Sequence, residues 1–116
     1  MARAILTQDR LDTAIEPKVG GYHAETVAEV QAAVAANRIV VVGMRGNPHV
    51  KWARKALDAA GLPYRYMEYG SYTSQWHRRL ALKMWSGWPT FPMVFVDGVL
   101  IGGNSDLKKK LSESAL

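Results

Sequence analysis

Residues 88–103 read Trp-Pro-Thr-Phe-Pro-Met-Val-Phe-Val-Asp-Gly-Val-Leu-Ile-Gly-Gly, and this stretch decides the fold. The Asp97-Gly98 pair between two β-rich runs predicts a tight hairpin, because glycine tolerates the positive φ that a two-residue turn requires. Pro92 stands at the first position of its run, where its missing N–H costs the strand ladder least. Gly102-Gly103 leads into residues 105–111, whose spacing is helical. The stretch therefore predicts a hairpin that delivers the chain to a helix N-terminus.

Upstream of the hairpin, the run Ile39-Val40-Val41-Val42 is β-branched and shows no polar alternation. Such a run predicts a central strand that is buried on both faces. Asn47 is a good N-cap and Pro48 a good first helical residue, so a helix is expected from 49 to 60. Further expected elements are a helix over 26–37 that begins with a capping box of Thr26 and Glu29, a strand over 64–69 and a helix over 73–85.

The length of 116 residues allows one domain with a real core. No apolar run reaches about 18 residues, so neither a membrane-spanning helix nor a membrane partner is expected. The first ten residues lack the apolar centre of a signal peptide, which makes the cytoplasm the expected compartment. Residues 1–24 are expected to form an irregular N-terminal arm, and residues 25–116 the folded domain.

The chain contains no cysteine. This excludes disulfides, thiolate catalysis and cysteine-ligated metal or iron–sulfur sites within these residues, and the histidines show no metal-ligand spacing. The net charge of +5 more often marks a solvated basic surface than an anionic partner, and no nucleic-acid-binding module is present. Trp52 falls off the apolar stripe of its helix. An exposed tryptophan beside Arg54 and Lys55 would suit a partner surface.

The order of expected elements is the thioredoxin-like order, and particular residues narrow it to one family. The chain resembles the glutaredoxins, and most closely the monothiol Cys-Gly-Phe-Ser type, over residues 25–116. The resemblance rests on the loop 44–48, on Arg79 and Lys83, and on residues 88–92, 97–98 and 101–103. It implies an α/β, thioredoxin-like fold with a four-stranded mixed sheet flanked by helices.

The resemblance fails at the position of the active-site cysteine. Counted back from Ala53 and Leu57, that cysteine would fall on or near Asn47. A carboxamide is neither a nucleophile nor a cluster ligand, so the family chemistry does not carry over. His49, at the start of the same helix, is a weak candidate acid or base, although an exposed histidine without such a role is commoner.

The resemblance also implies where glutathione would lie. The tripeptide would run along the main chain of Phe91, with Pro92 as the cis-proline, and place one carboxylate at the N-terminus of the last helix, where exposed N–H groups favour an anion. The other carboxylate would meet Arg45 and Arg79. The implied contacts at the last helix are Gly103, Asn104, Ser105 and Asp106. Surface charge explains the two arginines equally well, and helix capping or packing explains the residues at the helix start.

Several functions remain open at this point. The first is a redox-inactive glutaredoxin-like module that binds glutathione or a protein partner as an adaptor, without a covalently bound cofactor. The second is a cysteine-independent enzyme that uses glutathione and activates it through His49 or a tyrosine. A structural or assembly role with a vestigial groove, and a role in iron–sulfur or thiol homeostasis through a partner, complete the alternatives.

Overall fold

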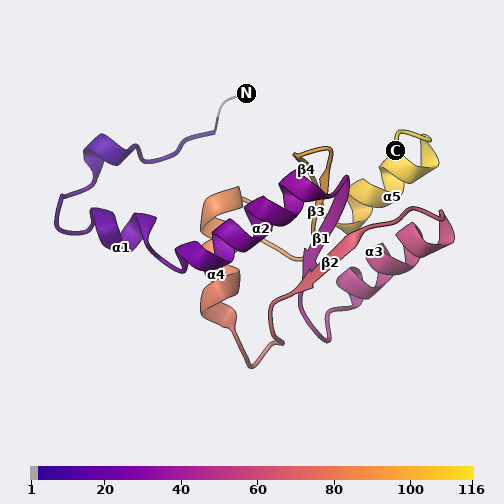
Figure 1. Cartoon of the computed structure of the whole chain (residues 1–116), viewed down its shortest axis with the longest axis horizontal. Coiled ribbons are helices and arrows are strands. Elements are labelled where there is room, and N and C mark those ends of the chain that lie inside the picture. The colour runs from indigo at the N-terminus through magenta and orange to yellow at the C-terminus, as the bar shows by residue number, and fades with distance from the viewer. Residues whose placement is uncertain (1–2) are drawn as a thin grey trace.

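The computed structural model describes residues 3–116, so the first two residues of the expected arm lie outside the described residues. Helices and strands alternate along most of the chain (Figure 1). The helices are η1 (Gln8–Arg10), α1 (Glu16–Gly20), α2 (Ala24–Ala36), α3 (Pro48–Ala59), α4 (Trp76–Ser86) and α5 (Asn104–Ser112). The strands are β1 (Ile39–Gly43), β2 (Arg65–Glu68), β3 (Met93–Val96) and β4 (Val99–Gly102). No helix within 3–116 has both the length and the apolar character needed to cross a bilayer.

The four strands form one mixed sheet in the order β2-β1-β3-β4. β1 pairs with β2 in parallel, and the pairs β1–β3 and β3–β4 are antiparallel. β3 and β4 are joined by the turn at Asp97 and Gly98, both of which have positive φ. The hairpin and the mixed four-stranded sheet predicted from the sequence are therefore confirmed.

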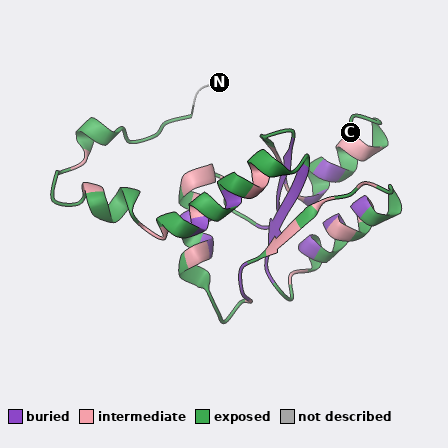
Figure 2. Cartoon of the chain, viewed as in Figure 1, coloured by how far each residue is buried: buried purple, intermediate pink, exposed green. Residues whose placement is uncertain are grey.

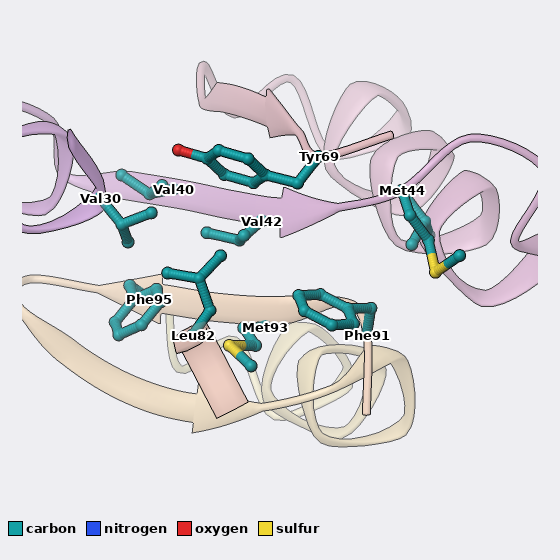
Figure 3. Close-up of a cluster of buried hydrophobic side chains, with 10 residues drawn as sticks. Val30, Val40, Val42, Met44, Tyr69, Leu82, Phe91, Met93 and Phe95 are labelled. Carbon is teal, nitrogen blue, oxygen red and sulfur yellow. The ribbon is translucent and has the colours of Figure 1, made fainter. Parts of the chain in front are cut away.

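β1 is the centre of the core, because every one of its residues is buried (Figure 2). Successive side chains of a strand point to opposite faces, so the run of branched residues supplies two cores. Val40 and Val42 pack with Leu82 of α4 on the face that also carries α2 (Figure 3). Ile39 and Val41 pack with Leu107 of α5 on the face that carries α3. The sheet thus separates the α2–α4 pair from the α3–α5 pair.

The capping box expected at Thr26 and Glu29 is wrong. The helix begins earlier, at Ala24, and its N-cap His23 has the left-handed φ of 46°. Thr26 is fully buried, and its hydroxyl accepts a hydrogen bond of 2.8 Å from Nε of Arg78 in α4. Arg78 also donates to Glu29 at 3.0 Å. The pair that looked like a local cap is instead a tertiary contact between α2 and α4, which sequence spacing alone does not reveal.

The helix expected over 73–85 begins three residues later, at Trp76. The hydroxyl of Ser74 accepts from the backbone N–H of Ser71 at 3.0 Å. Such local side-chain bonds offer the backbone an alternative to the helix. Residues 71–74 therefore form a turn, and Gln75 enters the helix with a φ of 55°.

The N-terminal segment that was expected to be irregular contains η1 and α1. It lies against α4 at two described points. Nη1 of Arg3 donates to the carbonyl of Ser86 at 3.0 Å, near the C-terminus of α4. The hydroxyl of Tyr22 is 2.7 Å from Nδ1 of His77, near the N-terminus of α4. The arm thus spans the length of that helix.

Two leucines of α4 provide a matched test of the core. Leu82 is fully buried, whereas Leu80 is 38% exposed. Leu82→Ala removes packed methyl groups and leaves a cavity, so we expect it to lower the free energy of unfolding by about 2–5 kcal/mol. Leu80→Ala is the control and should lower it by less than about 1 kcal/mol. Urea denaturation measures both. Equal losses from the two variants would contradict the placement of α4.

Candidate functional site

The candidate site forms where β1 ends and β3 begins. These strands are antiparallel, and Val42 pairs with Met93, so the end of one strand lies beside the start of the other. β1 leads into the loop that ends at Asn47, and β3 is preceded by Phe91 and Pro92, which are joined by a cis peptide bond. The strand register therefore brings Asn47 to Phe91, although 44 residues separate them in sequence.

The side chain of Asn47 connects these two segments. Its Oδ1 accepts hydrogen bonds from the backbone N–H groups of His49 at 2.9 Å and Val50 at 3.3 Å, which caps α3. Its Nδ2 donates to the carbonyl of Phe91 at 3.4 Å. Asn47 is thus the predicted N-cap, and its carboxamide also holds the helix start against the segment before Pro92.

A groove of about 260 Å³ lies beside this contact, and we call it the Pro92 groove. It lies between the segment before β3 and the first turn of α5, and His49 of α3 also lines it. Six residues expected to contact glutathione gather in its wall. The complete lining is His49, Trp88, Thr90, Phe91, Pro92, Gly103, Asn104, Ser105 and Asp106.

The first turn of α5 gives one end of the groove its electrostatic character. The first N–H groups of any helix have no partner four residues back, and they favour an anion together with the helix dipole. The carboxylate of Asp106 already accepts from the N–H of Gly103 at 3.0 Å. The backbone N–H groups of Asn104 and Ser105 precede the first α-helical bond of this helix. This end can therefore hold a carboxylate of a ligand.

Two polar atoms of the groove wall are buried and lack a partner within residues 3–116. They are Nε1 of Trp88, which can only donate, and Oδ1 of Asn104, which can only accept. Asn104 is only 8% exposed. A buried polar atom without a partner is unfavourable by about 1–3 kcal/mol. Both atoms have almost no solvent-accessible surface, so they lie beneath the surface of the groove rather than on it.

Trp88 and Thr90 were missed as groove residues by the sequence reasoning. Both lie inside the stretch that decides the fold, and they flank the prolines. Their position beside Phe91 in the sequence could have indicated that they line the groove.

Arg45 lies outside the Pro92 groove. Its side chain is exposed, and its Nε is 3.7 Å from Oε2 of Glu68 at the end of β2. It lines a neighbouring hollow of about 250 Å³ on the other side of Asn47, together with Lys51 and Arg54. The structure therefore does not bring Arg45 together with the residues of α5.

Arg79 is also absent from the groove wall, because it serves the loop before α4. It is only 7% exposed, and its Nη1 donates to the carbonyls of Tyr69 and Ser74. Burial lowers the pKa of its guanidinium. The alternative of an ordinary surface charge at Arg79 is therefore wrong, and its contact with glutathione stays a prediction. Lys83 is nearer to the groove, with its Nζ 5.7 Å from the centre of the Phe91 ring.

The tyrosines near this edge of the sheet are poor bases. Burial, followed by the hydrogen bond to Glu68, raises the pKa of Tyr66 to about 12. Burial, with the hydrogen bond to Glu29, raises the pKa of Tyr69 further. Both phenols therefore stay protonated near neutral pH. Within 3–116 no three acidic or histidine side chains are arranged to hold a metal ion.

Comparisons with known proteins agree with the fold. The glutaredoxin family model matches residues 39–101, which run from β1 to β4 and include Asn47 and Pro92. A glutaredoxin-like protein of Dictyostelium discoideum is 49% identical over 98 residues, which are 84% of this chain and 80% of that protein. Glutaredoxin 4 of Escherichia coli strain K12 is 32% identical over 84 residues, 67% of this chain and 70% of that protein.

Among solved structures, the buckwheat glutaredoxin–glutathione complex has a TM-score of 0.69 to this chain. It is 25% identical, and the match covers 78% of this chain and 83% of that chain. That protein was therefore captured with the tripeptide in a structure of the same fold.

The N-cap at Asn47 can be tested by stability. We expect Asn47→Ala to lower the free energy of unfolding by about 0.5–2 kcal/mol, because two backbone donors of α3 lose their acceptor. Asn47→Ser is the matched control, since its hydroxyl caps a helix about as well as asparagine and sets no carboxylate against the carbonyl of Phe91. Thermal and urea unfolding measure both. If serine destabilised the chain as much as alanine, the capping bond would not be the source of the loss.

Proposed function

Because this chain belongs to the glutaredoxin family and carries no cysteine, we propose that it is a redox-inactive member that binds glutathione in the Pro92 groove. In this proposal it acts as a binding or adaptor module, and glutathione is a ligand rather than a reductant. The observation that carries the proposal is the gathering of six expected glutathione contacts in the wall of the Pro92 groove.

The chemistry at Asn47 supports the proposal that the chain has no thiol redox activity. A helix N-terminus lowers the pKa of a thiol placed there and so favours the reactive thiolate. Asn47 occupies such a position at the start of α3, and it also contacts the segment before Pro92. Its carboxamide does not ionise at physiological pH and is a far weaker nucleophile than a thiolate. The position that would favour a thiolate is therefore used for capping.

The chemistry of glutathione suits the groove. The tripeptide has two carboxylates, an amino group and peptide units. A carboxylate fits the open N–H groups at the start of α5. Its extended main chain can lie along Phe91 and Pro92, which line the groove. The buckwheat complex supports this ligand over other extended anions.

A cysteine-independent enzyme is the second hypothesis, and it rests on one observation. His49 is the one imidazole among the residues that line the groove. It is exposed, and its ring packs edge-on against Trp52 rather than against a carboxylate that would orient it. Glutathione-dependent turnover of an electrophile that is lost in His49→Ala would favour this hypothesis over the binding module.

Charge at the first turn of α5 should control glutathione affinity. We expect Ser105→Glu to weaken binding about tenfold, because its carboxylate competes with that of the ligand for the helix N-terminus. Ser112→Glu is the matched control, since it adds the same charge to an exposed serine at the other end of α5. Isothermal titration calorimetry measures both. Equal weakening by the two variants would place glutathione elsewhere.

A cysteine introduced at position 47 should have a reactive thiol. We expect Asn47→Cys to have a thiol pKa below the usual value of about 8.5 and to form a mixed disulfide with oxidised glutathione, releasing one reduced glutathione. Ser112→Cys, at the C-terminal end of α5, is the control and should keep an ordinary or raised pKa. The pH dependence of alkylation by iodoacetamide measures both.

The unmodified chain should lack the activity that Asn47→Cys gains. It should show no glutathione-dependent disulfide reductase activity above background, and Asn47→Cys should gain it. Activity in the parent chain would contradict the redox-inactive role, and equal reactivity of the two cysteine variants would contradict the position assigned to Asn47.

A further inference from the structure

Outside the Pro92 groove, the packed pair of α3 and α5 carries an exposed tryptophan among lysines. Trp52 is 46% exposed. Nζ of Lys108, from α5, lies 5.8 Å from the centre of its ring, and the ring of His49 packs against it edge-on at 5.2 Å. Lys51 and Lys55 are exposed on the same helix. We call the surface formed by Lys51, Trp52, Lys55 and Lys108 the Trp52 face.

We propose that the Trp52 face binds an acidic, extended segment of a partner protein. The carboxylates of that segment pair with the lysines, and an apolar side chain packs on the exposed indole. This surface lies outside the Pro92 groove, and the inference stands whether or not the groove binds glutathione. It adds a class of protein partner to the proposed function.

The exposed lysines of this face are the reason for proposing an acidic partner. Lys51 and Lys55 are four residues apart in α3 and so lie on one side of the helix, and Lys108 approaches Trp52 from α5. None of these lysines forms an ion pair within residues 3–116. These exposed cations, two on α3 and one on α5, attract an anionic partner and speed its association.

Trp52 gives the surface an anchor as well as a charge. Exposed tryptophans are enriched among the residues that dominate the energy of protein interfaces. A structural role in the core does not account for Trp52, because nearly half of its surface is in solvent and it belongs to neither buried cluster. His49 contacts Trp52 and also lines the Pro92 groove, so the face and the groove are continuous.

The same surface argues for a peptide over a nucleic acid. Asp58 is exposed and follows Lys55 by three residues on the same helix, so a carboxylate continues the row of lysines. A phosphate backbone would be repelled there, whereas a peptide can place a neutral or basic residue opposite Asp58. Single-stranded nucleic acids also favour a series of stacking aromatics, and this face offers one tryptophan.

The test uses a fluorescein-labelled peptide, Asp-Glu-Asp-Leu-Asp-Glu-Gly-Lys, with fluorescence anisotropy at two salt concentrations; its last two residues can lie opposite Asp58. We expect the parent chain to bind it, with affinity that falls as salt rises. Lys51→Glu with Lys55→Glu should weaken binding about tenfold or more. Arg10→Glu with Lys18→Glu makes the same change in net charge on the exposed arm, and it should weaken binding less than about twofold.

The tryptophan is tested separately from the charge. Trp52→Ala should weaken peptide binding about fivefold or more, and Trp52→Phe should retain most of it. Circular dichroism establishes that each variant is folded. Three results would overturn the inference: no binding by the parent chain at millimolar peptide, equal weakening by the two double charge reversals, or tighter binding of an oligothymidylate than of the peptide through the same lysines.

Discussion

Burial of β1 on both faces is the constraint on which the rest of the structure depends. Each residue of Ile39–Gly43 is buried, so the strand cannot lie at an edge, and each face requires a cover of helices. The antiparallel register with β3 then follows from matching apolar partners, with Val42 beside Met93. That register places the loop after β1 against Phe91 and Pro92. The site is therefore a consequence of the core.

The contact between Asn47 and Phe91 joins the start of α3 to the segment before Pro92. The carboxamide satisfies two donors at the start of α3 and reaches one carbonyl before Pro92. A thiolate at a helix N-terminus is favoured by the same open N–H groups that the carboxamide now occupies. The helix, the turn and the groove depend on backbone geometry and packing, whereas thiol chemistry would require a sulfur atom at this position.

The sequence was sufficient for features governed by local rules. The hairpin at Asp97-Gly98, the buried run 39–42 and the N-cap at Asn47 were all predicted, because turn chemistry, burial pattern and capping act over a few residues. The failures concern tertiary contacts. Thr26 resembled a cap but meets Arg78, and Arg79, for which a surface charge was the alternative, is buried among carbonyls of its own loop. No spacing rule distinguishes an exposed arginine from a buried one.

The central claim is that the Pro92 groove binds glutathione without a thiol. A titration of isotope-labelled protein with reduced glutathione, followed by two-dimensional NMR, tests it most directly. The account predicts that the largest shifts fall on the amides of Phe91 and of residues 103–106 and on the indole N–H of Trp88. Shifts that remain absent at millimolar glutathione, or that cluster on the hollow beside Arg45 instead, would contradict it.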